Sequence, residues 1–134
     1  MEIGSVRDGY LAKLDDYPDD EEKIFVMRGR GNDELAPSEE LLSDYKELEE
    51  KHGNRWEAWN RCRYESRFRE KMKCEKSQER IKEIAEEVAN GKRVRLICWE
   101  KNRPCHRFIL KQLIGEEVTK ILVAPFEKEG EGGG

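Results

Sequence analysis

The chain has 134 residues, of which 42% are charged and 36% hydrophobic, and its formal net charge is −4. This length predicts one domain with a modest core, and the charged share exceeds the roughly 25% of an ordinary soluble domain. No apolar stretch approaches the roughly 20 residues of a membrane helix, and the first residues lack the features of a signal peptide. We therefore expect a cytoplasmic protein without a membrane partner, whose four cysteines stay reduced.

The first two thirds of the chain predict up to two strands followed by helices. Residues 1–22 form an acidic segment that allows one short strand. Residues 23–28 form an apolar run of strand length, and this near-continuous hydrophobicity is typical of a strand covered on both faces. Helices are predicted after this strand at about residues 38–52, 55–72 and 77–90, the first with Ser38 as its N-cap.

The last third predicts a strand–helix–strand unit. Its strands are expected at residues 93–99 and 118–124, with a helix over residues 104–114 between them. Because the connections are short, the crossover is expected to be right-handed and the two strands parallel.

These elements together predict an α/β fold, with a small parallel sheet, helices on both faces and a single three-layer domain. The domain is expected to span residues 23–126. Residues 127–134 are expected to be a disordered Gly/Glu tail.

Charge is unevenly distributed along the chain. Residues 1–54 hold 7 basic and 16 acidic residues, whereas residues 55–82 hold 10 basic and 5 acidic residues. The basic segment is the candidate nucleic-acid surface, with Trp56, Trp59 and Tyr64 available for stacking on bases. Glutamates three or four residues from the basic side chains favour a solvated helix instead, and the helical spacing of the aromatics favours core packing. The abundance of Lys, Arg and Glu also resembles that of proteins from hot environments.

Several chemically reactive residues gather where strand 93–99 is expected to meet the next helix. Cys98 ends this strand, and Cys105, His106 and Arg107 open the helix. Ligands of open parallel sheets bind beyond the carboxyl ends of the strands, and the first turn of a helix favours an anion. The same helix field is expected to lower the pKa of Cys105. Each residue alone has ordinary structural uses, and it is their combination in one place that indicates a site.

The same residues resemble the signature of a known family. The run Cys98-Trp99-Glu100, followed by Cys105-His106-Arg107, resembles the Cys-x-Glu…Cys-His-Arg block of the domain-of-unknown-function 488 family. The similarity covers about residues 23–114. It implies a compact α/β domain with its site near this block, and it supplies no reaction. Arg28 matches a family position that commonly closes an Asp-x-Arg pattern, and Val26 stands here in place of the acid.

The predicted function is a site for a small anion or a reactive thiol, in an enzyme or binding domain for a nucleotide or another phosphate-containing molecule. Thiols serve as nucleophiles, and imidazole and carboxylate groups serve as acids and bases. Guanidinium groups bind phosphate through two hydrogen bonds. The catalytic candidates are Cys98, Glu100, Cys105 and His106, and the anion-binding candidates are Arg28, Ser38 and Arg107.

Two alternatives remain beside this prediction. One is a zinc site built from Cys98, Cys105 and His106, because zinc prefers thiolate and imidazole ligands. The other is a nucleic-acid-binding module that uses the basic segment 55–82. The leading prediction requires no cofactor.

Overall fold

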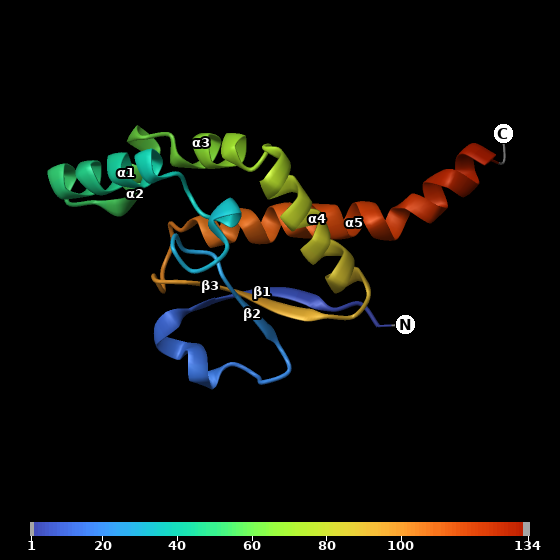
Figure 1. Ribbon diagram of the computed structural model, residues 1–134. Coiled ribbons are helices and arrows are strands. Elements are labelled where there is room, and N and C mark those ends of the chain that lie inside the picture. Colours follow the sequence, from blue (N-terminus) through green and yellow to red (C-terminus); the bar gives the residue numbers. More distant parts are fainter. Residues whose placement is uncertain (1, 133–134) are drawn as a thin grey trace.

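A small parallel sheet forms the base of the fold in the computed structural model, which describes residues 2–132 and the side chains of residues 2–126 (Figure 1). The strands follow the order β1-β3-β2, and both neighbouring pairs are parallel. Their bounds are β1 Ser5–Tyr10, β2 Glu22–Phe25 and β3 Arg93–Cys98. The central strand β3 is buried from residue 94 to residue 98, as a strand covered on both faces requires. The predicted α/β class and small parallel sheet are confirmed.

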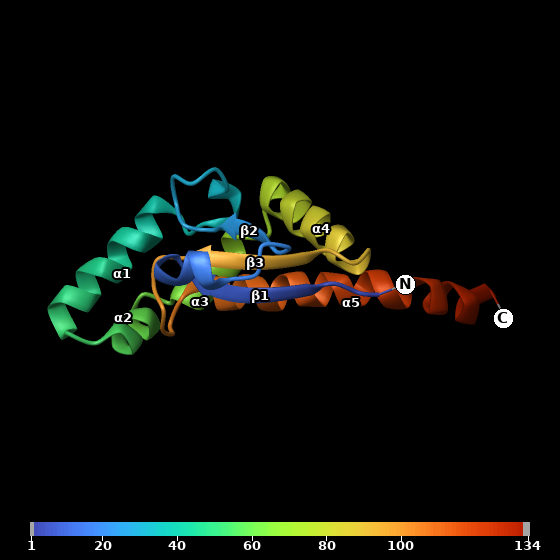
Figure 2. The same ribbon diagram turned by 90° about the horizontal axis from the view of Figure 1, so that it is seen from below.

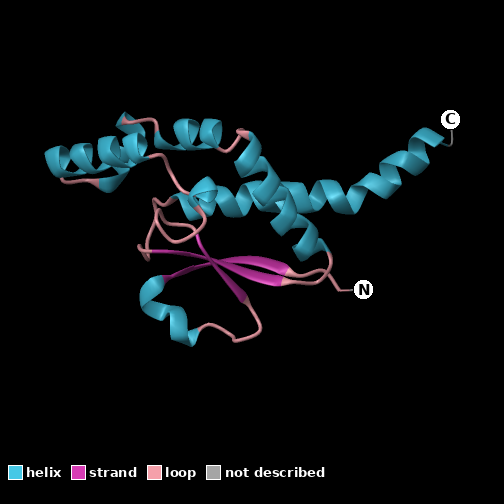
Figure 3. Cartoon of the chain, in the orientation of Figure 1, coloured by secondary structure: helices cyan, strands magenta, loops and turns pink. Residues whose placement is uncertain are grey.

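The sheet lies between α-helices on one face and a 3₁₀ segment on the other. Helices α4 and α5 pack on each other and lie above the sheet in Figure 1, with the 3₁₀ helix η1 below it. Figure 2 shows the same layers from below, with β1 crossing in front of α5, and Figure 3 marks the helices and strands by colour. The helical bounds are η1 Leu11–Asp16, η2 Asp33–Leu35, α1 Glu39–His52, α2 Arg55–Arg61, α3 Tyr64–Lys71, α4 Glu75–Ala89 and α5 His106–Gly132.

Helix α1 begins and ends where the sequence predicts. The Ser38 side chain accepts a hydrogen bond from the backbone N–H of Leu41 at 3.1 Å, so it is the N-cap. Gly53 adopts a left-handed conformation with φ of 64° and ends the helix, which is the usual role of glycine there.

The single helix predicted over residues 55–72 is instead two helices, α2 and α3. Arg63 breaks the helix by adopting a left-handed conformation with φ of 55°. The Arg67 side chain donates a hydrogen bond to the carbonyl oxygen of Cys62 at 3.2 Å, which provides a partner for a group at the break. The break also lets Trp59 and Tyr64 stack, with ring centroids 4.0 Å apart.

The strand predicted over residues 118–124 is wrong, because this segment belongs to α5. Leu110, Ile114 and Val118 follow each other at intervals of four residues and are all buried, which is the spacing of one helix face. The helix predicted over residues 104–114 instead continues past Gly115, which lies within α5. The predicted strand–helix–strand unit is therefore absent, and β3 finds its parallel partners in β1 and β2.

Both terminal segments of the chain contain regular secondary structure. The acidic segment 1–22 contains β1, the short strand that the sequence allowed, and β1 pairs with β3 in the sheet. Helix α5 continues to Gly132, into the predicted tail 127–134, and residues 133 and 134 lie outside the described residues. In the described part of the chain, every helix is too short or too polar to span a membrane.

A buried ion pair closes the sheet face that carries η1. The Arg95 guanidinium on β3 donates to both carboxylate oxygens of Glu21, at 2.6 and 2.9 Å. It also donates to the carbonyl oxygen of Asp8 at 2.9 Å and lies 4.2 Å from the ring centroid of Tyr17. The hydrogen bond from Arg95 lowers the pKa of Glu21, although burial acts in the opposite direction. The pair thus links β3 to the segment between β1 and β2.

Candidate functional site

A cavity of about 300 Å³ lies beyond the carboxyl ends of β2 and β3. This is the edge of a parallel sheet at which ligands bind. Its walls come from the segment after β2, from helices α1 to α3, and from the junction between β3 and α5. The lining residues are Met27, Arg28, Pro37, Leu42, Tyr45, Lys46, Trp59, Tyr64, Cys98, Trp99, Glu100, Pro104, Cys105 and His106.

Two buried cysteines and a histidine meet at this cavity. Cys98 is the last residue of β3, and Cys105 immediately precedes α5, whose first residue is His106. The two sulfur atoms and a ring nitrogen of His106 all lie within 4.8 Å of one another. Cys98 is 5% exposed and Cys105 is 7% exposed, so both thiols are shielded from bulk solvent. The sequence predicted that these residues converge, and the structure brings them together.

The hydrogen bonds of His106 define which ring nitrogen carries the proton. Its Nε2 lies 2.8 Å from the carbonyl oxygen of Val26. A carbonyl oxygen only accepts, so we assign the proton of the neutral ring to Nε2. The other nitrogen, Nδ1, then carries a lone pair and lies 3.8 Å from the sulfur of Cys105. The Phe68 ring packs against the imidazole with its centroid 5.3 Å away, which holds the ring in this orientation.

The surroundings favour the thiolate of Cys98 over that of Cys105. A hydrogen bond from Cys105, the backbone N–H groups of Trp99 and Glu100, and the charge of Arg107 lower the pKa of Cys98 to about 7, although burial opposes them. The hydrogen bond to Cys98, together with burial, raises the pKa of Cys105 to about 12. We expected the helix field to lower the pKa of Cys105, but its thiol proton stabilises the neighbouring sulfur instead.

Arg107 and Ser38, two predicted anion ligands, have structural roles. Arg107 is 1% exposed, and its guanidinium donates to the carbonyl oxygens of Glu100 and Lys101, the latter at 2.6 Å. Its Nε lies 4.0 Å from the carboxylate of Asp8. The hydrogen bonds of Arg107 thus hold the loop between the two cysteines in place, and Ser38 is the N-cap of α1. Neither residue lines the cavity.

The family of the chain is decided by a match to a protein-family profile over residues 31–118, described as DUF488-N3a, the active DUF488-N3 subclade. The chain belongs to the DUF488-N3a family. The match contains β3, the cysteine block and most of the cavity walls. No curated protein sequence and no solved structure gave a match.

Three charged side chains, those of Arg28, Lys46 and Glu100, line the cavity of this DUF488-N3a domain. Arg28, a predicted anion ligand, lines the cavity, and one guanidinium nitrogen donates to the carbonyl oxygen of Pro37 at 3.2 Å. Glu100 also lines it, with its carboxylate 3.1 Å from the guanidinium of Arg55. Lys46 was missed, although its place one turn after Leu42 on α1 is a signal that the two share a helix face.

The aromatic wall of the DUF488-N3a cavity consists of Trp59, Tyr64 and Tyr45, which line it together with both cysteines. Trp59 and Tyr64 stack, and the ring of Tyr45 meets them edge-on with centroids 6.1 and 5.3 Å away. The predicted core packing of Trp59 and Tyr64 is confirmed, whereas Trp56 is exposed. The Tyr45 hydroxyl is buried with no hydrogen-bond partner among the described residues. A hydrogen bond to a molecule in the cavity would satisfy this hydroxyl group.

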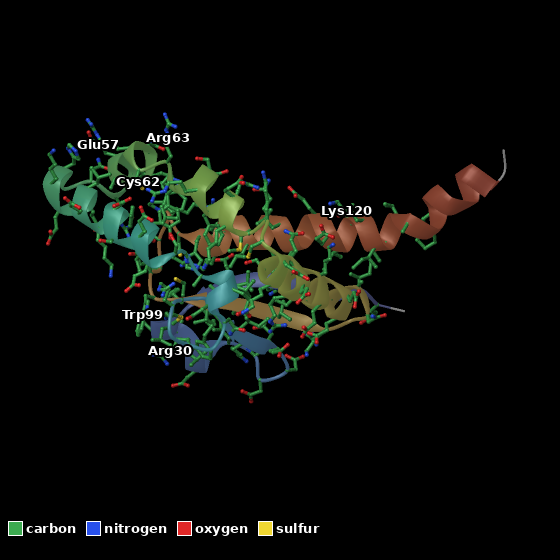
Figure 4. All side chains as sticks on the ribbon, turned by 45° about the horizontal axis from the view of Figure 1, so that its top comes forward. Arg30, Glu57, Cys62, Arg63, Trp99 and Lys120 are labelled. Atoms are coloured by element: carbon green, nitrogen blue, oxygen red, sulfur yellow. The ribbon has the colours of Figure 1, made fainter. Side chains whose placement is uncertain are left out.

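Trp99 lies at the rim of the cavity. It is 57% exposed, and the guanidinium of Arg30 lies 5.1 Å from its ring centroid (Figure 4). An exposed indole beside a cation is available for contact with a ligand that enters the cavity.

Basic side chains of segment 55–82 form ion pairs with glutamates of the same helix. Arg61 pairs with Glu57 at 2.9 Å, and Arg69 pairs with Glu65 at 3.0 Å. In Figure 4, the side chains of Glu57 and Arg63 mark α2 and the residue just before α3. These four-residue spacings are those of a solvated helix face.

The cluster of Cys98, Cys105 and His106 also has the donor set of a metal site. Two sulfurs and the lone pair on Nδ1 are ligands that zinc prefers. The bond from Nε2 to the carbonyl oxygen of Val26 is the kind of second contact that fixes the ring of a metal-binding histidine. Three protein ligands beside a cavity leave a fourth position for water or substrate.

Proposed function

We propose that this DUF488-N3a domain is an enzyme in which the Cys98 thiolate attacks a small anionic molecule held in the cavity. The observation that carries the proposal is the position of Cys98, whose side chain lines a cavity that also contains Arg28 and Lys46. A nucleophile and two cations in one small cavity suit a substrate with an electrophilic centre and an anionic group. The description of the family as an active subclade supports an enzyme.

The cavity walls indicate the substrate class. The volume of about 300 Å³ lies at the lower end of small-molecule sites. The stacked pair of Trp59 and Tyr64 offers aromatic surface to a planar ring, and Arg28 and Lys46 offer charge to a phosphate. We therefore favour a nucleotide or another small phosphate-containing molecule.

Each catalytic candidate has a role in this proposal. Cys98 forms a covalent bond to the electrophilic centre of the substrate and displaces a leaving group, which departs with the bonding electron pair. Its thiolate is favoured by Cys105 and by the backbone N–H groups that follow it. Glu100 lines the cavity beside Cys98 and is the acid/base candidate that faces the substrate. His106 acts through Cys105, because its free nitrogen faces that sulfur.

Alkylation by iodoacetate and iodoacetamide tests this proposal. We expect Cys98 to react about fivefold faster than free cysteine at pH 7, because the larger thiolate fraction outweighs its lower intrinsic nucleophilicity. The rate should fall as the pH drops below about 7, since the thiolate then takes up a proton. Iodoacetate should be favoured over iodoacetamide at Cys98 more strongly than at the exposed Cys74. Peptide mass spectrometry measures each rate.

A matched pair of variants distinguishes the effect of a charge in the cavity on the reaction of Cys98 from the effect of the overall charge of the protein. Arg28→Gln should reduce the preference of Cys98 for iodoacetate, whereas Arg61→Gln should not, because Arg61 pairs with Glu57 on the surface. The proposal is wrong if Cys98 reacts no faster than free cysteine, or if both variants leave the preference for iodoacetate unchanged.

A zinc site is the second candidate function, and the orientation of His106 favours it. If Cys98, Cys105 and His106 bind zinc, we expect about one zinc ion per chain in the purified protein, measured by elemental analysis. The metal should be lost in His106→Gln and retained in Cys74→Ser, since Cys74 lies outside the cluster. Purified protein with only trace zinc, and no uptake when zinc is added, would contradict this second candidate.

A further inference from the structure

We propose that Cys98 and Cys105 also act as a dithiol pair that reduces a small disulfide, with His106 as the base for the second thiol. This activity rests on the proposed function, because it uses the same nucleophile and the same cavity. It differs in the reacting partner, which is a disulfide rather than a phosphate-containing electrophile.

The spacing of the two sulfurs carries the proposal. They belong to one cluster whose ligand atoms lie within 4.8 Å, although they come from the end of β3 and from the residue before α5. A disulfide needs a sulfur–sulfur distance of about 2.05 Å, so the two atoms must approach by less than about 3 Å. A rotation of the two side chains moves the sulfurs over distances of this size.

The other two cysteines have different surroundings. Cys62 ends α2, and its thiol donates to the carbonyl oxygen of Trp59 at 3.7 Å. Cys74 is exposed and lies 3.1 Å from the hydroxyl of Ser77. Neither belongs to the cluster of Cys98, so an internal disulfide at the cavity has one available pairing.

The reaction proceeds in two balanced steps. The Cys98 thiolate attacks one sulfur of the disulfide RSSR, forms a mixed disulfide with one half, and releases the other half as the thiolate RS⁻. This RS⁻ takes up from solvent the proton that Cys98 released when it ionised. Cys105 then gives its proton to Nδ1 of His106 and attacks the sulfur of Cys98. This step forms the bond between Cys98 and Cys105 and releases the second RS⁻, which takes up the proton. The two protein thiols lose two electrons, and RSSR gains them as two thiols.

His106 is positioned for the second step. Its Nδ1 lies 3.8 Å from the sulfur of Cys105 and carries the lone pair, because Nε2 donates to Val26. The thiol of Cys105 is buried, so bulk water is a poor acceptor for its proton. An adjacent base removes this obstacle, as it does for other activated thiols.

Intact-mass spectrometry with bis(2-hydroxyethyl) disulfide tests the proposal. The full chain carries Cys74→Ser, which removes the exposed thiol. We expect this protein to lose two hydrogens and to release two molecules of 2-mercaptoethanol per chain. With Cys105→Ser added, the mixed disulfide on Cys98 should accumulate instead. With Cys98→Ser added, the protein should stay unmodified over the same time.

The His106→Gln variant tests the base. Glutamine retains an N–H donor for the carbonyl oxygen of Val26 but has no basic nitrogen beside Cys105. The ratio of mixed to internal disulfide should rise at least about tenfold. This is a conservative threshold, because a general base usually accelerates a step by roughly a hundredfold or more. If this variant does not fold, His106→Asn, which also has no basic nitrogen, takes its place in the same comparison.

The results also distinguish the two proposals. If Cys98 is alkylated rapidly but the Cys74→Ser protein accumulates only the mixed disulfide, the dithiol activity is wrong and the proposed function stands. An equal mixed-to-internal ratio with and without His106→Gln overturns the role of His106 as the base. Slow alkylation of Cys98 overturns the proposed function, and with it the dithiol activity.

Discussion

Replacing Arg107 by methionine is expected to lower the free energy of unfolding by about 3 kcal/mol and to slow the alkylation of Cys98. Arg107 is almost fully buried and donates to the carbonyl oxygens of Glu100 and Lys101. Methionine fills similar space but leaves both carbonyl groups without these donors, and each such loss costs roughly 1–3 kcal/mol. The loop between the two cysteines is also released. Urea unfolding measures the free energy of unfolding, and reaction with iodoacetamide measures the alkylation rate of Cys98.

The thiol result follows from the electrostatics of the site. The charge of Arg107 is among the causes that lower the pKa of Cys98, so its removal raises that pKa and reduces the thiolate at pH 7. Lys111→Met is the matched control, because Lys111 lies one turn later on α5, also pairs with Asp8, and is partly exposed. The control should change stability by less than about 0.5 kcal/mol. A loss below about 1 kcal/mol in Arg107→Met would contradict the structural role of this residue.

The replacement Glu21→Gln is expected to lower the free energy of unfolding at pH 7 by about 3 kcal/mol. The side chains of Glu21 and Arg95 are 2% and 11% exposed, and two short hydrogen bonds join them. Glutamine removes the negative charge and leaves the guanidinium of Arg95 buried without a counter-charge. Breaking a buried pair from one side costs roughly 3–5 kcal/mol.

The same variant has a defined pH dependence. Arg95 lowers the pKa of Glu21 in the folded state, so the stabilisation is complete above the ordinary glutamate pKa of about 4.3 and is lost as the pH falls through the lower folded value. The difference between wild type and Glu21→Gln in urea unfolding should therefore shrink below about pH 4. The control Asp20→Asn removes one partner of an exposed pair with Arg93 and should cost less than about 1 kcal/mol. A difference that stays constant down to pH 2 would mean that Glu21 is not held ionised by Arg95.

The sequence predicts elements well where local and tertiary signals agree. Strand β3 and the start of α5 lie within one or two residues of their predicted places, because a continuous apolar run is followed by a loop and a helical stripe. Residues 118–124 mislead because Val118, Thr119, Ile121 and Val123 are β-branched, which favours a strand. Packing of the α5 stripe in the core overrides this local preference.

The sequence predicts that the two cysteines and the histidine of the candidate site lie together, but it does not predict the walls of the cavity. Cys98, Cys105 and His106 are close in sequence, and the end of a parallel strand marks the place where they meet. Tyr45, Lys46 and other wall residues lie more than thirty residues earlier in the chain. Their approach depends on the angle between α1 and the sheet, which no local pattern encodes. The left-handed conformation of Arg63, which precedes α3 and separates it from α2, likewise has no signal in the local sequence.

The cavity is lined by three separate stretches of chain, of which residues 27–28 after β2 are the shortest. The sulfurs and the imidazole come from residues 98–106, whereas the aromatic wall and Lys46 come from residues 37–64. Mutations in residues 37–64 can alter which molecules enter while the reactive trio keeps its geometry. Descendants of such a domain can therefore acquire new specificities through α1, α2 and α3 alone and inherit the reactive centre intact.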